Sequence, residues 1–354
     1  ARTVEVTFKG SHPDEYTYEY KGGRVDIPAT VTHRRRTFQV KSIASYFCKN
    51  EYISRISIAE GVDTIHKNAF TICLLSDTVR IPASVKFIGQ EAFTPHAYIK
   101  SFVVDAGNKV YDSRGGCNAI IETETNTLVS GCKSSIIPNS VTSIGNSAFS
   151  YCKSLTGVEI PNNVTSIAER AFYNCTSLTT IDIPESVMSI GDGTFSSCNL
   201  LSSVSFTEGL QTIKDNAFYD CKNLTSITLP NSVTNIGDWA FQNCSKLAYV
   251  QIDAITPPAI GGTNIGDWVF QECSNLEYVY IGNNLTYVGG SGIFDGCTSL
   301  TVEWNVKGEH ELTPLSYNGG IEAIVFGNDV TAYGACLAAK ENGVNIPEDV
   351  SIVG

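Results

Sequence analysis

Cysteine recurs at a fixed interval in this chain, and its thiol is the most reactive side-chain group that the sequence repeats. Eight of the twelve cysteines lie three residues after a regularly spaced phenylalanine: Cys73, Cys152, Cys175, Cys198, Cys221, Cys244, Cys273 and Cys297. Thiols in such a series could form a ladder of disulfides, bind metal ions, or fill a core as small apolar side chains.

The repetition itself favours the third of these alternatives. Coils stacked at strand spacing, about 4.7–4.9 Å, would bring equivalent cysteines within disulfide range, so distance alone does not exclude bonding. However, equivalent side chains in stacked coils point the same way, and each sulfur could pair with only one neighbour. A zinc site needs four tetrahedral ligands, whereas a straight column offers sulfurs on one side and no interleaved histidine. We therefore expect buried, reduced core thiols.

Polar residues replace cysteine at two of the equivalent positions. His96 follows Phe93 and Asn50 follows Phe47 at the same distance. Both side chains form hydrogen bonds, so the position is expected to lie near backbone groups at a turn. His96 is interpreted as a structural residue rather than a ligand.

Two other cysteines flank a segment that suggests a β-hairpin. Cys117 and Cys132 enclose "NAIIETETNTLVSG", and pairing Ile121 with Leu128 would place the two cysteines opposite each other. The sequence leaves two alternatives open, a cross-strand disulfide or two adjacent thiols.

Signals of catalysis are missing from the sequence. The five histidines, at positions 12, 33, 66, 96 and 310, are scattered, and no Gly-x-Ser-x-Gly, His-Glu-x-x-His or phosphate-binding loop occurs. We expect no enzyme activity, no cofactor and no metal site.

Composition limits the classes of partner. Apolar residues make up 42% and charged residues 17% of the 354 residues, and the net charge is −12, so a folded chain that does not bind nucleic acid is expected. No apolar run approaches the roughly 18–20 residues of a membrane span, and no secretory signal peptide is visible at Ala1. The one basic cluster, Arg34 to Arg36, is placed at a hairpin tip, as a solvated turn or a partner patch.

The elements that carry the cysteines repeat with the phenylalanines. A step of 23 residues separates successive members of the series Phe149, Phe172, Phe195, Phe218 and Phe241. Each unit then carries Leu-x-x-Val-x-Ile-Pro, whose alternation predicts a short strand that ends at the proline. A second apolar pair closed by glycine predicts another extended piece, and the segment around the phenylalanine is long enough for one or two helical turns. The sequence thus predicts one solenoid coil per unit, with neighbouring coils covering each other's apolar faces.

Three regions follow from where the repeat holds. Residues 1–41 are expected to form a β-rich cap, residues 42–302 the solenoid with a hairpin insertion at about 105–136, and residues 303–354 a C-terminal cap or fused tail. Residues 321–354 predict a β-α-β segment, and "VFGNDVTAYGACLAAKENGVNIPEDVSIVG" resembles a piece of the lactose-repressor and periplasmic sugar-binding fold.

The repeat resembles the BspA-like leucine-rich repeats of bacterial surface proteins. The resemblance rests on Ile-Pro-x-x-Val-x-x-Ile-Gly-x-x-Ala-Phe-x-x-Cys-x-x-Leu runs that begin at Ile137, Ile160 and Leu229, and it covers roughly residues 25–300. It implies an α/β solenoid, a right-handed leucine-rich-repeat superhelix with short strands and short helices. It also implies a secreted or cell-surface protein that adheres to host proteins or other cells.

Outward positions on the predicted strands are the candidate binding surface. They are small or acidic in the earlier coils and become Tyr249, Gln251, Tyr278 and Tyr280 towards the C-terminus. Tyrosine contributes contact area with little entropy loss in protein recognition, although it is also an ordinary strand residue. Trp239 and Trp268 suggest a second patch near the phenylalanine. The hypotheses are protein-protein binding, with host extracellular-matrix or cell-surface proteins as targets, carbohydrate capture, or a spacer without a ligand.

Overall fold

The structure is a computed structural model, and its described residues cover most of the predicted repeat. They are residues 3–6, 23–47, 53–71, 73–94, 96–252, 263–281, 285–288 and 292–300. The predicted C-terminal β-α-β segment and Asn50 lie outside them. Contacts divide the chain into two units, Ala1–Leu178 and Thr179–Gly354, which are described in turn.

The first unit is built from short strands and a single short 3-10 helix among its described residues. Its elements are β1 (Thr3–Val6), β2 (Arg24–Ile27), β3 (Thr30–His33), β4 (Arg36–Ile43), β5 (Arg55–Ile58), β6 (Thr64–Ile65), β7 (Thr78–Ile81), β8 (Phe87–Ile88), β9 (Ser101–Val104), β10 (Tyr111–Asp112), η1 (Arg114–Gly116), β11 (Ile120–Glu122), β12 (Thr127–Ser130), β13 (Ser143–Ile144) and β14 (Ser166–Ile167).

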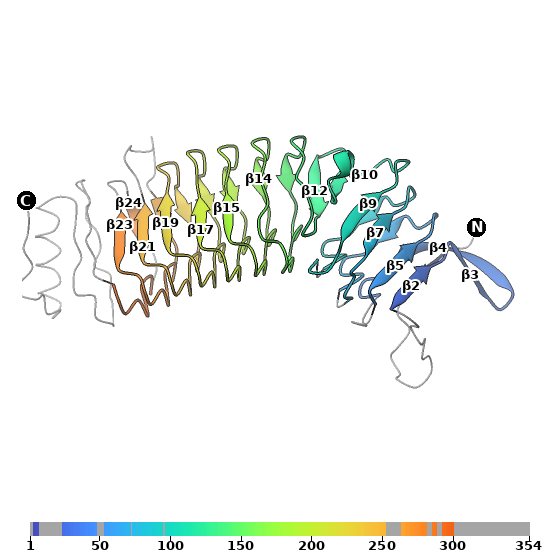
Figure 1. The fold of residues 1–354 in the computed structure, drawn as a ribbon, viewed down its shortest axis with the longest axis horizontal. Coiled ribbons are helices and arrows are strands. Elements are labelled where there is room, and N and C mark those ends of the chain that lie inside the picture. Colours follow the sequence, from blue (N-terminus) through green and yellow to red (C-terminus); the bar gives the residue numbers. More distant parts are fainter. Residues whose placement is uncertain are drawn as a thin grey trace, which may run out of the picture. The chain divides into compact units, whose positions relative to one another are not determined.

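Parallel pairing between successive coils dominates this unit. One sheet has the order β1-β4-β6-β8, while β2 pairs with β5 and β7 pairs with β9 on other parts of the coils. Equivalent repeat positions face each other, as Ile65 does Ile88. One exception is β3, which forms an antiparallel hairpin with β4 around Arg34 and Arg35, so the predicted hairpin tip is confirmed (Figure 1).

The insertion forms the predicted antiparallel hairpin. Strands β10, β11 and β12 pair in sequence, and β12 then continues in parallel with β13 of the next coil. The predicted pair of Ile121 and Leu128 is present, but the register shifts at the next residue, where Ile120 faces Ser130. The shift removes the register on which the proposed Cys117–Cys132 disulfide depended, and both cysteines carry thiols in the structure.

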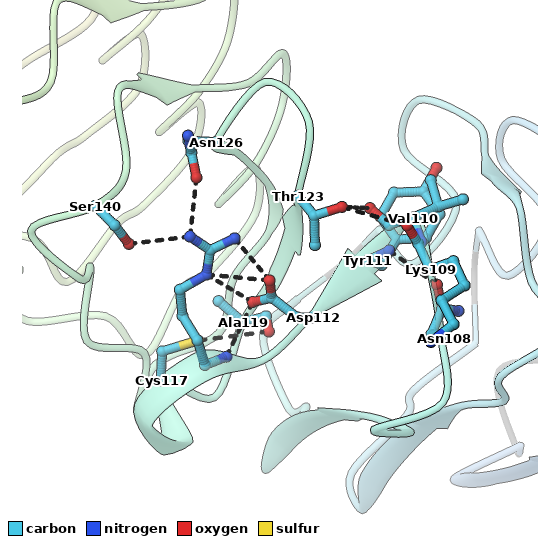
Figure 2. Close-up of polar contacts among 11 residues, drawn as sticks. Asn108, Lys109, Val110, Tyr111, Asp112, Cys117, Ala119, Thr123, Asn126 and Ser140 are labelled. Atoms are coloured by element: carbon cyan, nitrogen blue, oxygen red, sulfur yellow. Dashed lines mark hydrogen bonds and ion pairs between the residues drawn. The ribbon is translucent and has the colours of Figure 1, made fainter.

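Polar side chains fasten the insertion to the repeat (Figure 2). The guanidinium of Arg114 donates to both carboxylate oxygens of Asp112, at 2.6–3.1 Å, and to Asn126 Oδ1 at 2.8 Å. It also donates to Ser140 Oγ at 3.2 Å, which lies in the following coil. Asn108 likewise binds backbone groups with both its amide nitrogen and its oxygen. These contacts replace the regular coil-to-coil packing that the insertion interrupts.

The second unit repeats one coil with little variation. Its strands are β15 (Thr180–Asp182), β16 (Ser189–Ile190), β17 (Ser203–Ser205), β18 (Thr212–Ile213), β19 (Ser226–Leu229), β20 (Asn235–Ile236), β21 (Tyr249–Ile252), β22 (Thr263–Ile265), β23 (Tyr278–Ile281) and β24 (Leu285–Val288). They form parallel rows, with the orders β15-β17, β19-β21-β23 and β16-β18-β20-β22-β24. Coils of about 23 residues therefore stack as predicted.

Stacked phenylalanine rings fill the centre of each unit. Neighbouring rings lie almost parallel, with centroids 5.0 Å apart for Phe149 and Phe172 and 5.1 Å apart for Phe218 and Phe241. All four side chains are fully buried. Offset aromatic stacking and the large area of each ring make this column a main contributor to the stability of every layer.

The segment around each phenylalanine is a series of turns, so the prediction of short helices was wrong. Residues two before and two after Phe149, which are Ser147 and Tyr151, have positive φ angles of 56° and 57°. Backbone N–H groups alternate in their acceptors here. Those of Ser147, Phe149 and Tyr151 donate to carbonyls of the next coil, whereas those between them bond within the coil. A helix would use all of these donors internally, which would leave the neighbouring coil without partners.

Candidate binding surface

The repeated cysteines from Cys152 to Cys273 form a column of buried thiols that are not accessible for reaction at the surface. Thiols donate to the carbonyl oxygen of the phenylalanine one coil earlier, at 3.2 Å for Cys221 to Phe195 and 3.3 Å for Cys244 to Phe218. The side chains in this column from Cys152 to Cys273 are buried. Burial raises the pKa of Cys152 to about 12, so the reactive thiolate is scarce at neutral pH.

Cys73 departs from the expectation for this column. It is disulfide-bonded, and the other nine described cysteines carry thiols. The prediction of a reduced core thiol was therefore wrong at this position. The 23-residue repeat gave no sign of it, because Cys73 has the same spacing from its phenylalanine as the others.

His96 replaces the thiol where the insertion interrupts the repeat. Its Nδ1 lies 2.9 Å from the carbonyl oxygen of Ser150 and its Nε2 lies 3.0 Å from Ser130 Oγ. Both ring nitrogens are thereby used, with Nδ1 donating and Nε2 accepting. Burial lowers the pKa of His96 to about 4, against a smaller opposing effect of the Ser150 hydrogen bond. The residue is neutral at physiological pH and joins three segments. An adjacent cavity of about 10 Å³ has room for roughly one water molecule.

The described residues contain no group of three or more metal-ligating side chains. Nor does any helix within them have the length and apolarity of a membrane span.

Register brings the predicted tyrosine positions into one row of strands. Tyr249 pairs with Tyr278, and Gln251 pairs with Tyr280, across the parallel strands β21 and β23. Alternate residues of β21 point into the core, where Val250 is buried. The strands thus place four large polar positions next to one another in the register, and Tyr249 and Gln251 lie on the face opposite the core.

Tyr249 is the exposed member whose contacts the structure describes. Its side chain is 39% exposed, and its hydroxyl donates to Gln251 Oε1 at 2.7 Å. The hydrogen bond holds the ring along the strand, which reduces the freedom that it would lose on binding a partner. The preceding strand carries only Ser226 and Thr228 at the same positions, so the aromatic surface begins at β21.

The two predicted tryptophans form a rigid pair at a corner of the coils. The indole rings of Trp239 and Trp268 stack, with centroids 5.4 Å apart and an angle of 5° between their planes. Both residues have positive φ, 55° and 51°. At the equivalent position of the next coil stands Gly292, where an added Cβ would overlap the indole of Trp268. They occupy turns rather than a helical side, and both are half-buried.

Carboxylates beside the tryptophans have a structural role that sequence reasoning missed. Asp215 Oδ1 accepts from the backbone N–H of Asp238, at 3.0 Å, and Asp238 Oδ1 accepts from that of Asp267, at 2.8 Å. An added Cβ at Gly237 or Gly266 would overlap these carboxylates. The recurring Ile-Gly and Gly-Asp pairs in the sequence were the available signal.

A family comparison decides the class of protein. The model of the BspA type leucine rich repeat region matches in six copies, over residues 36–114, 125–248 and 201–318. The chain belongs to this family. The 23-residue interval between its phenylalanines is thus that of BspA-type repeats, as the resemblance implied. The same holds for its column of phenylalanines and its rows of parallel strands.

Solved structures of similar fold agree with this assignment. A leucine-rich repeat protein from Eubacterium ventriosum ATCC 27560 is 18% identical, with a TM-score of 0.58, over 84% of this chain and 87% of that one. The pneumococcal vaccine antigen PcpA is 16% identical, with a TM-score of 0.51, over 83% and 86%. At such identities the likeness concerns the fold. No curated protein matches the chain.

Proposed function

We propose that this BspA-type repeat protein is a non-enzymatic binding protein that acts at the cell surface or after secretion. The family supports a surface setting, since BspA-type repeats occur in bacterial surface proteins. The expected targets are proteins, with host extracellular-matrix or cell-surface proteins as the class.

The observation that carries the proposal is the tyrosine row of β21 and β23, defined as Tyr249, Gln251, Tyr278 and Tyr280. Tyrosines on the surface of a sheet supply large contact areas at little entropic cost, and they are enriched among the residues that dominate binding energy. The rows of serine and threonine on earlier strands offer no such anchors. We therefore place the centre of the binding surface at Tyr249.

The test is a binding screen of the full chain against matrix proteins and a glycan array. Tyr249→Ala and Tyr278→Ala, alone and together, should weaken binding of a captured protein by about tenfold or more, as for residues at the centre of an interface. Tyr98→Ala is the matched control, because Tyr98 is 53% exposed but lies elsewhere in the chain. The affinity of the Tyr98→Ala variant for the captured protein should stay within about twofold of that of the unchanged chain, a difference in binding free energy below ~0.5 kcal/mol.

Three outcomes would contradict the proposal. Capture of a glycan through the same tyrosines, without any protein, would favour the carbohydrate hypothesis. Unchanged affinity in the double variant would show that the tyrosine row is ordinary strand surface. A chain that binds nothing in either screen would be a spacer.

A further inference from the structure

The β3–β4 hairpin ends in the densest cationic cluster of the chain. Arg34 and Arg35 are the two turn residues, and His33 and Arg36 close the hairpin as a cross-strand pair. All four side chains are exposed. The ion pairs that the structure describes lie elsewhere, at residues such as Arg24 and Arg114, so none of the three arginines is neutralised by a described carboxylate.

The backbone of this turn does not favour arginine. Arg34 and Arg35 have φ angles of 47° and 58°, the left-handed conformation of a type I′ hairpin turn, for which Asn-Gly is strongly preferred. A residue other than glycine is less stable in this conformation, because its Cβ comes close to the following carbonyl oxygen. Left-handed residues other than glycine also occur at the corners of the coils, as at Ser147 and Tyr151, where hydrogen bonds to the next coil hold them. Here, two guanidinium groups occupy a position where Asn-Gly would give a more stable turn.

We propose that the hairpin tip, His33 to Arg36, is a binding site for sulfated polysaccharide. The planar guanidinium group forms paired hydrogen bonds with sulfate, phosphate or carboxylate oxygens, and it is more weakly hydrated than an ammonium group. The opposite face of the hairpin adds the exposed hydroxyl groups of Thr32 and Thr37, which lie 3.4 Å apart.

Charge and shape favour a flexible polysaccharide over other polyanions. The chain carries a net charge of −12, which repels a rigid duplex or a wide anionic surface that approaches the whole body. The turn end of the hairpin stands clear of the neighbouring strands β2 and β5 (Figure 1). A flexible polysaccharide with closely spaced sulfates can contact such a tip without approaching the acidic rest of the chain. The apolar residues Val31 and Phe38 are half-buried, which leaves the tip without an apolar group to insert into a bilayer.

The first arm of the test separates the effect of the arginines on the stability of the turn from their effect on binding. In the full chain, R34N/R35G should raise the melting temperature or leave it unchanged, because Asn-Gly suits the turn. The same variant should bind heparin about tenfold or more weakly at about 0.15 M ionic strength, because two charge-assisted contacts are lost. R34K/R35K keeps both charges but cannot form paired hydrogen bonds, and a loss of several-fold is expected.

The control removes the same charge elsewhere on the first unit. R80Q/K86Q changes two exposed basic residues of the solenoid and should alter heparin affinity by less than about twofold. De-sulfated heparin should bind far more weakly than heparin to the unchanged chain. Duplex DNA and phosphatidylserine vesicles, compared at equal anionic charge, should also bind more weakly.

Several results would overturn the inference. These are unchanged heparin affinity in R34N/R35G, equal losses in the control, equal binding of de-sulfated heparin, and tighter binding of DNA or vesicles. A lower melting temperature together with lost binding would assign the arginines to the stability of the turn instead. The site lies in the first unit and the tyrosine row in the second, so a failure of one proposal leaves the other standing.

Discussion

At the scale of single residues, the thiol column shows why cysteine suits its repeated position. The site is fully buried, so it favours a small apolar side chain, but it also faces the carbonyl oxygen of a phenylalanine in the preceding coil. Cysteine satisfies both demands, because its S–H group is a weak donor. His96 instead donates from a ring nitrogen to the carbonyl oxygen of Ser150, which lies later in the chain, and its second nitrogen reaches Ser130 of the insertion.

Native thiols should resist alkylation. Iodoacetamide reacts with the thiolate, and burial both shields these sulfurs and raises the pKa of Cys152 and Cys221. We expect little labelling of the Cys152 to Cys273 series in the folded chain at pH 8, and full labelling in denaturant. Cys73 should need prior reduction. Peptide mapping by mass spectrometry measures both, and rapid native labelling of Cys221 would contradict the prediction.

Acidification should lower the stability of the fold through His96, which hydrogen-bonds Ser150 and Ser130. The pKa of this residue is about 4 in the folded chain and about 6.5 when unfolded, so the unfolded chain binds the proton more tightly. Stability is therefore lost as pH falls from about 6.5 towards 4, by up to ~3 kcal/mol for this group. Denaturant unfolding at pH 7 and pH 4 measures the difference. His96→Asn should show a smaller loss between the two pH values, and an equal loss would refute the assignment.

At the scale of elements, the turn corner around each phenylalanine depends on contacts between coils. Its alternating donors link one coil to the next at every second residue. Left-handed residues bracket the phenylalanine without being glycine, as at Arg170 and Asn174. Such a corner has little stability of its own, because half of its hydrogen bonds exist only when the neighbouring coil is in place.

Within the insertion, Gly131 is a position where a larger side chain would not fit. Its N–H donates to the carbonyl oxygen of Ala148, at 2.8 Å, and an added Cβ would overlap the ring of Phe149. Gly131→Ala should destabilise the first unit by ~1–3 kcal/mol, the usual cost of overpacking. Gly157→Ala is the matched control, since nothing lies within 4 Å of its added Cβ. Equal melting temperatures for the two variants would exclude the clash.

At the scale of the whole molecule, stability accumulates coil by coil. Each described layer contributes one phenylalanine ring and a few parallel strand pairs to its contacts with the adjacent layers. Solenoids of this kind tolerate a change in the number of coils, provided that the neighbouring faces still match.

Deletion of one whole coil should therefore preserve the fold. Removing residues 218–240 brings Phe241 to 23 residues after Phe195, so equivalent positions remain aligned. We expect a cooperative unfolding transition that is lowered by a few degrees, about the effect of ~1 kcal/mol in a domain of this size. Removing residues 218–229 alone would offset every row and should abolish the transition. Circular dichroism on heating measures both, and similar curves for the two deletions would refute the coil model.

Much of this architecture follows from the pattern of residue types. The phenylalanine interval, the Val-x-Ile alternation and the two hairpins were visible because burial acts on each position separately and repeats every coil. The pairing of Ile121 with Leu128 came from the same alternation. The family followed from the recurrence of these positions, and the predicted tyrosine positions lie on two paired strands.

Tertiary structure alone decided how the backbone between those positions is bonded. The segment of Ser147 to Cys152 has the length and composition of a helical turn, yet stacking diverts alternate N–H groups to the next coil. The contact of Arg114 with Ser140 and the tryptophan stack also depend on neighbours distant in sequence. The sequence by itself thus determined the repeat and its core, since apolar burial is a property of each residue. The hydrogen bonds between coils needed the stack, because their partners are absent until it forms.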